Sequence, residues 1–127
     1  MVRMGEQPQR IDTEGCARGD AALARAFDLL GQRWNGVVLG NLSSAPAGFR
    51  ELARAIDGIS DSMLSTRLTA LTQAGLITRT VSEGPPLSVT YALTDAGAAL
   101  IPALLQISRW AEEHLPGPQF TAATPRR

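Results

Sequence analysis

Short hydroxyl side chains are concentrated between Asp61 and Ala74, in the segment DSMLSTRLTALTQA. At a rotation of 100° per residue, Ser62, Thr66 and Thr69 fall on the face opposite three leucines, with Ser65 near them. A hydroxyl group can donate or accept a hydrogen bond at a base edge in DNA. A solvated helix face is the alternative. Because this segment has no Glu or Lys, we favour base contacts by these four side chains.

Arginine supplies all twelve basic residues, and twelve Asp and Glu balance them to a formal net charge of zero. The chain as a whole is therefore not attracted to nucleic acid, and a DNA-binding surface would need local clusters of Arg. Arg50, Arg79 and, less so, Arg54 could contact phosphates, which positions a protein without reading sequence. Each could equally be an ordinary surface charge. Arg67 flanks the leucine stripe and is either a phosphate contact or a half-buried structural residue.

Side chains that usually carry catalysis or bind metals are scarce. One Cys, Cys16, and one His, His114, exclude an intrachain disulfide and make a metal site improbable. No nucleophile is placed with a base, so we expect no enzyme and no cofactor. Cys16 has two interpretations: a reactive thiolate favoured by nearby Arg18, or an inert thiol in a flexible segment.

Length and composition predict one globular domain. The chain has 127 residues, of which 44% are hydrophobic and 19% charged, as in a protein with a real core. We expect loosely held ends at 1–19 and 116–127 and a folded body at 20–115. The N-terminus lacks a signal-peptide h-region, and no apolar stretch could cross a bilayer. We therefore expect a cytoplasmic protein without membrane contact.

Apolar residues at helical spacing predict four helices in the first half of the body. They lie at 23–30, 37–42, 49–56 and 61–74. We expect Gly31 to end the first in the left-handed conformation. The second is apolar on nearly all sides and should be buried. Asp57-Gly58 is a turn signal, Ser60 should cap the fourth helix, and Gly75 should end it.

A period of two replaces the helical period after Gly75. Residues 76–81 and 87–93 flank the turn sequence SEGPP, which predicts a β-hairpin with one buried face. Its tip carries Glu83 and no basic residue, so we expect the tip to add little to DNA recognition.

A long last helix should follow, capped by Thr94. Pro102 should kink this helix or mark a late start. The helix has two adjacent apolar stripes, and exposing one of them on a monomer would be unusual. We therefore predict a homodimer, with these residues at the interface: Leu100, Leu104, Ile107 and Trp110. Trp34, Phe49 and Tyr91 are expected to be core residues, whereas Trp110 could also line a pocket at the seam.

Seven short motifs occur in an order that resembles the HxlR family of transcription regulators, over about residues 22–115. They are Gly31-Gln32-Arg33-Trp34, Phe49-Arg50-Glu51-Leu52, Gly58-Ile59-Ser60, Leu64-Ser65-Thr66-Arg67-Leu68, Gly75-Leu76-Ile77-Thr78-Arg79, Pro85-Pro86 with Val89-Thr90-Tyr91, and Leu93-Thr94-Asp95-Ala96-Gly97.

The resemblance implies a mainly α, MarR-like winged helix-turn-helix with a small β-hairpin, in which the N- and C-terminal helices form the dimer interface. It implies that helix 61–74 enters the major groove of double-stranded DNA and that the hairpin lies beside the minor groove. It also implies repression as the usual mode, and a cysteine before the first helix that senses oxidants or electrophiles in several members. Cys16 would take that role, with an electrophile or small molecule as inducer. A winged-helix module that binds protein instead of DNA is the alternative, and the neutral net charge supports it.

Overall fold

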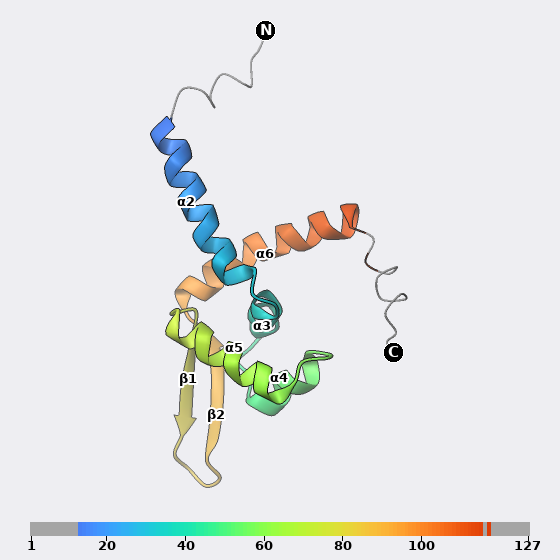
Figure 1. The fold of residues 1–127 in the computed structure, drawn as a ribbon. Helices are drawn as coiled ribbons and strands as arrows, with labels where there is room; N and C mark the ends of the chain where they lie inside the picture. The colour runs from blue at the N-terminus through green and yellow to red at the C-terminus, as the bar shows by residue number, and fades with distance from the viewer. Residues whose placement is uncertain (1–12, 116, 118–127) are drawn as a thin grey trace. The chain divides into compact units, whose positions relative to one another are not determined.

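The computed structural model describes residues 13–115 and Gly117, with side chains from Arg18 onward. Five helices and a two-stranded antiparallel hairpin make this part of the chain mainly helical (Figure 1). The chain divides into two compact units, Met1–Asn35 and Gly36–Arg127. None of the helices in the described part combines the length and hydrophobicity that crossing a bilayer requires.

The first unit contains helix α2, Thr13–Leu30, which begins within the segment 1–19 that we expect to be loosely held. Residues 1–12 lie outside the described part. The prediction of a left-handed glycine at Gly31 was wrong, because positive φ occurs at Trp34 instead (84°). Gly31 is needed for space: a Cβ there would lie 2.5 Å from the carbonyl oxygen of Phe27.

Three helices follow: α3 (Asn35–Leu42), α4 (Phe49–Ala55) and α5 (Asp61–Gln73). Their apolar faces, with the first residue of the hairpin, form the core, which comprises Val38, Leu39, Leu42, Leu52, Ile56, Leu64, Leu68, Leu71 and Ile77. Helix α3 is buried as expected on most sides, but Val37 remains exposed.

The ends of α5 are fixed by the predicted capping groups. The Ser60 hydroxyl accepts a hydrogen bond from the backbone N–H of Met63 at 3.1 Å. At the other end Gly75 adopts positive φ (82°), and the N–H of Leu76 donates to the Leu71 carbonyl at 3.0 Å. This closing turn satisfies the last carbonyls of α5 and leads the chain directly into the hairpin.

The hairpin pairs β1 (Ile77–Ser82) with β2 (Ser88–Leu93), with Ile77 opposite Leu93 and Ser82 opposite Ser88. The expected single buried face is not found: Ile77 is buried, β2 is mostly half-buried, and the rest of β1 is exposed. The physical reason is that the base of the hairpin packs on α5 and α6, whereas its tip projects past the core (Figure 1).

Helix α6 (Asp95–His114) begins against the end of α5. The Thr94 hydroxyl accepts from the N–H of Gly97 at 3.1 Å and donates to the Gly75 carbonyl at 2.7 Å. A Cβ at Gly97 would clash with the Leu76 carbonyl, so a side chain there would separate the two elements. Pro102 lies inside the helix, so the idea that it marks a late start was wrong.

Candidate nucleic-acid interface

Helix α5 presents two chemically opposite faces. Leu64, Leu68 and Leu71 are buried. The hydroxyl residues on the opposite side are exposed: Ser62, Ser65, Thr66 and Thr69. The capped N-terminus and the left-handed Gly75 fix the length of this helix, and the leucines fix its rotation. The hydroxyl face is therefore held outward by the core beneath it.

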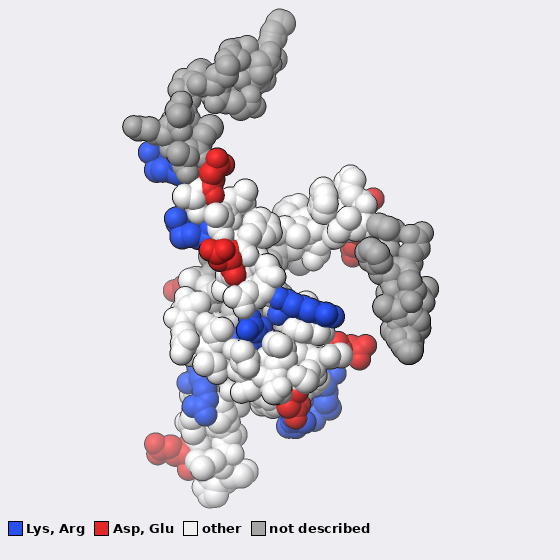
Figure 2. Space-filling model, viewed as in Figure 1, with Lys and Arg blue, Asp and Glu red and all other residues white. Residues whose placement is uncertain are grey.

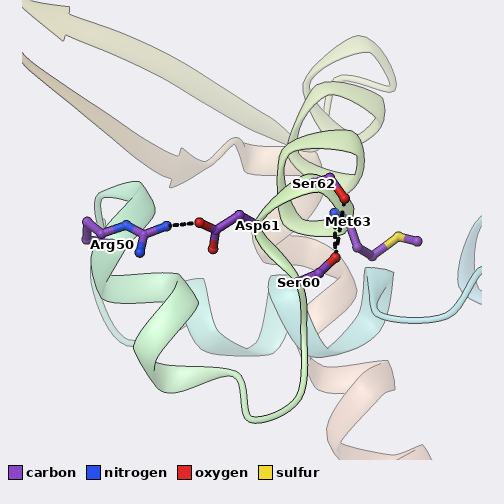
Figure 3. A network of polar contacts seen from close by, with 5 residues as sticks. All are labelled: Arg50, Ser60, Asp61, Ser62 and Met63. Carbon is purple, nitrogen blue, oxygen red and sulfur yellow. Dashed lines mark hydrogen bonds and ion pairs between the residues drawn. The ribbon is translucent and has the colours of Figure 1, made fainter.

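The N-terminal end of α5 is joined to α4 by an ion pair (Figure 3). The guanidinium of Arg50 lies 2.8 Å from the carboxylate of Asp61, and it also lies over the Phe49 ring at 5.1 Å. Both charged side chains are more than half exposed, so the pair adds little stability. Its effect is on charge, because the positive group that we expected to contact phosphate is balanced by a negative one at the same place.

The hydroxyl groups on the exposed face differ in what they can still do. The Thr66 hydroxyl donates to the Ser62 carbonyl at 2.9 Å, so its hydrogen is used within the helix and its oxygen remains an acceptor. The hydroxyl oxygen of Ser62 lies 3.4 Å from the hydroxyl oxygen of Ser60. Among the described residues, the hydroxyls of Ser65 and Thr69 have no hydrogen-bond partner. They can therefore donate or accept toward a ligand.

A hollow of about 400 Å³ opens between α5 and the hairpin. We call it the α5–hairpin hollow. Its lining residues come from both elements: Ser65, Leu68, Thr69, Thr72 and Gln73 from α5, and Arg79 and Tyr91 from the hairpin. Arg79 and Tyr91 are direct cross-strand partners. We had interpreted Tyr91 as core, but it is only half-buried. The pairing register of a hairpin was the signal that could have linked it to Arg79.

Arg67 and Arg54 have surroundings that differ from those of Arg50 and Arg79. Arg67 is half-buried beside the leucines and has an interaction partner, which favours the structural interpretation over a phosphate contact. Arg54 is exposed in the last turn of α4. The charged residues of the hairpin are Arg79 and Glu83, and Figure 2 shows blue atoms on its body and red atoms near its tip.

The residues expected at a dimer interface are divided along α6. Leu100 and Leu104 are half-buried in its first half, whereas Ile107 and Trp110 are exposed further along. Trp110 stacks on His114 with ring centroids 5.5 Å apart. Cys16 lies within α2, but its side chain is outside the described part.

Residues 18–115 contain no group of three or more His, Cys, Asp and Glu that could hold a metal ion. Two helices joined by a tight turn, with the second displaying polar groups and a hairpin after it, define a winged helix-turn-helix. Proteins of this class bind DNA and regulate transcription.

The chain belongs to the HxlR family, because the profile of the HxlR-like helix-turn-helix matches residues 29–119. The HTH-type transcriptional regulator YodB of Bacillus subtilis (strain 168) is 39% identical over 88 residues, which cover 69% of this chain and 79% of YodB. The structure of YodB in its reduced form matches with a TM-score of 0.69 at 35% identity, covering 76% of this chain and 94% of that one. A quinone-bound YodB structure matches with a TM-score of 0.64 at 34% identity, covering 73% and 98%.

The protein is thus a DNA-binding transcription regulator of the helix-turn-helix type, in a family made up of such regulators.

Proposed function

We propose that the protein is a homodimeric repressor that binds an inverted-repeat operator with the N-terminal half of α5 in the major groove. The observation that carries this proposal is the two-faced α5, whose exposed hydroxyl residues stand over three buried leucines. The N-terminal part of such a helix is the part that reaches base edges. The side chains that contact bases are then Ser62, Ser65 and Thr66, with Thr69 further along the helix.

The exposed apolar residues of α6 support a dimer. Ile107 and Trp110 remain about half exposed, at 46% and 54%, and a second copy would bury them. A two-fold dimer presents two α5 helices, so the half-sites should be separated by roughly 34 Å, one turn of B-DNA, or a multiple of it. An operator bound in this way is an inverted repeat.

The decisive experiment selects operator sequences from a genomic DNA pool and then compares binding by variants. Replacing Ser62, Ser65 and Thr66 together with Ala should weaken operator binding by roughly 1–3 kcal/mol for each hydroxyl that touches a base. Affinity for random DNA should change little, because phosphate contacts dominate it. Ser44→Ala with Ser108→Ala is the matched control, since both are exposed hydroxyls outside this face.

Two outcomes contradict the proposal. Full specific binding by a folded, dimeric triple-alanine variant would show that α5 is not the reader. The second outcome is a wild type that binds neither a selected operator nor random DNA at low salt. The chain would then be a winged-helix module that binds protein instead.

We further propose that Cys16 makes the regulator responsive to oxidants or electrophiles. The quinone-bound structure of YodB supports this proposal, and Cys16 is the one thiol in the sequence. In a reaction with a quinone, the thiolate sulfur would add to a ring carbon and the ring would take up a proton to become a hydroquinone thioether. No further oxidant is required.

Before treatment, Cys16→Ser should bind the operator with the affinity of the wild type. After treatment with a quinone, the variant should remain bound to the operator, whereas the wild type should dissociate from it. Intact-mass measurement on the wild type should show one adduct per chain. If both proteins release DNA alike, the cysteine is a bystander and the inducer acts elsewhere.

A further inference from the structure

The α5–hairpin hollow shares Ser65 and Thr69 with the base-contacting face proposed above, but its other lining residues have no role in that proposal. We propose that it seats a backbone phosphate of the DNA strand that separates the major groove from the minor groove, bound by Arg79 with Tyr91 and Gln73. This inference rests on the proposed function, because it takes α5 to lie in the major groove. It adds a positioning site built from the second half of α5 and the base of the hairpin.

The first argument is geometric. An element in the major groove and another beside the adjacent minor groove must lie on either side of one sugar–phosphate strand. We take those elements to be α5, which the proposed function places in the major groove, and the hairpin, which the family resemblance places beside the minor groove; the space between them is the hollow. A strand that passes between them therefore runs across its opening.

The second argument is the chemistry of the lining. Small-molecule sites are lined mainly by apolar side chains, whereas here Leu68 and the Tyr91 ring are the apolar part. No Asp or Glu lines the hollow, and Arg79 supplies a positive charge. Gln73 has amide N–H donors. Such a lining suits an anion that brings only acceptor oxygens, which is what a phosphodiester is.

Hydrogen bonding already present in the protein narrows the set of donors. The Thr72 hydroxyl donates to the Leu68 carbonyl at 2.7 Å, so it has no hydrogen left for a phosphate. Ser65 and Thr69 keep theirs, but they also belong to the face that we assign to bases. Arg79, Tyr91 and Gln73 are thus the residues whose donors are left for the backbone.

The third argument is rigidity, because a contact that positions DNA must not itself move. The backbone N–H and carbonyl of Tyr91 pair with Ala47 at 2.8 and 3.0 Å, and Tyr91 faces Arg79 across the hairpin. On the other wall, β1 follows α5 through the closed turn at Gly75. Both walls are therefore held by backbone hydrogen bonds before DNA arrives.

The charge balance makes a single arginine matter. Residues 36–115 contain five Arg and seven Asp and Glu, which leaves a formal charge of −2. Attraction to DNA is therefore local within this range of residues. Arg79 is the positive residue of the hairpin and Glu83 the negative one at its tip. The base of the hairpin, and not its tip, is the part that suits a phosphate.

The first test is a salt titration with a short random-sequence duplex. Arg79→Gln should lower the slope of log K against log salt by about 0.9 for each phosphate that the variant no longer neutralises. Tyr91→Phe should weaken binding several-fold with an unchanged slope, because it removes a hydroxyl group and no charge. Arg109→Gln is the matched control, since it removes an equal charge from an exposed site on α6. Equal slopes for Arg79→Gln and Arg109→Gln would overturn the inference.

The second test identifies the phosphate. Single methylphosphonate linkages, which are uncharged, are placed along the selected operator. In the wild type one position per half-site should weaken binding about ten-fold, and Arg79→Gln should be insensitive at that position. If the operator is bound but no position distinguishes the two proteins, the inference is wrong while the proposed function stands. If no operator can be selected, the proposed function is what has failed.

The third test separates backbone phosphate from a free anion. Inorganic phosphate is titrated into the DNA-free protein at constant ionic strength, and the backbone amide signals of Arg79 and Tyr91 are followed by NMR. The expected result is no saturable binding below millimolar concentration. Tight binding of phosphate that Arg79→Gln abolishes would assign the hollow to a small anion and would overturn the inference.

Discussion

Helices α5 and α6 are both amphipathic, yet they use their apolar residues in different ways. In α5 the three leucines on one face are each at most 1% exposed. In α6 only the first half packs, where Leu100 and Leu104 are half-buried, whereas Ile107 and Trp110 remain exposed. The apolar face of α5 is therefore complete within one chain, and that of α6 is not.

This difference separates what a single chain stabilises from what a second copy would add. Full burial of a large apolar side chain contributes about 1.5–3 kcal/mol relative to exposure. Helix α5 already has that contribution from each leucine, so its orientation belongs to the monomer. Helix α6 has unused apolar surface on Ile107 and Trp110, and association would recover part of this free energy. Three predictions test the contrast.

The largest expected effect is on the buried face of α5. Leu68→Ala should lower the free energy of unfolding by about 2–5 kcal/mol, because the core cannot fill the space it leaves. Urea denaturation measured by circular dichroism at a fixed protein concentration checks this value. Ser65→Ala, on the exposed face of the same helix, should change it by less than about 0.5 kcal/mol. Similar decreases in both variants would mean that α5 does not have two distinct faces.

A smaller effect is expected on α6, and it should appear in association rather than in folding. Ile107→Glu should weaken dimerisation by on the order of 2 kcal/mol, because the interface would then bury a carboxylate. Light scattering should shift toward the mass of one chain, 13.5 kDa. Gln106→Glu adds the same charge at a neighbouring exposed position and should keep the wild-type mass. A wild type that is already monomeric at micromolar concentration contradicts the dimer directly.

Local signals in the sequence were enough to predict the helix-turn-helix. The capping by Ser60 and Thr94, the turn at Gly58 and the end of α5 at Gly75 all depend on residues within a few positions of one another. The rotation of α5 followed from the leucine spacing alone. These features could be predicted because short-range backbone chemistry determines them.

Other features depend on distant parts of the chain, and the sequence did not reveal them. Val81 and Leu87 alternate like residues of a buried strand but are exposed at 45% and 71%, because none of the described residues covers the part of the hairpin beyond its base. The ion pair of Arg50 with Asp61 joins two helices across a turn. Tyr91 reaches the wall of the hollow only through the strand register. Periodicity carries no information about any of these partners.

The smallest effect compares the first turns of the two helices. Each begins with a hydroxyl cap followed by an aspartate, Asp61 in α5 and Asp95 in α6. Asp61 is paired with Arg50, whereas Asp95 makes no ion pair among the described residues. Replacing either with Asn removes a carboxylate that interacts favourably with the helix dipole, at a cost of about 0.3–1 kcal/mol in stability. Only Asp61→Asn should also change DNA binding.

The reason is that Asp61→Asn releases Arg50 at the end of α5 that we place against DNA. The released guanidinium can bind a phosphate, so affinity for random DNA should rise, and the salt slope should steepen by about 0.9. Arg50→Ala should do the opposite, because it leaves the Asp61 carboxylate uncompensated beside the phosphates. The DNA affinity of the double variant should lie between those of the two single variants. The coupling free energy between Arg50 and Asp61 should be below about 1 kcal/mol, because the pair is exposed. Fluorescence anisotropy at several salt concentrations measures the DNA affinity of the wild type, the two single variants, the double variant and Asp95→Asn. Identical DNA affinities for Asp61→Asn and Asp95→Asn would show that the ion pair does not face DNA, and the N-terminal end of α5 would then have to be placed elsewhere in the complex.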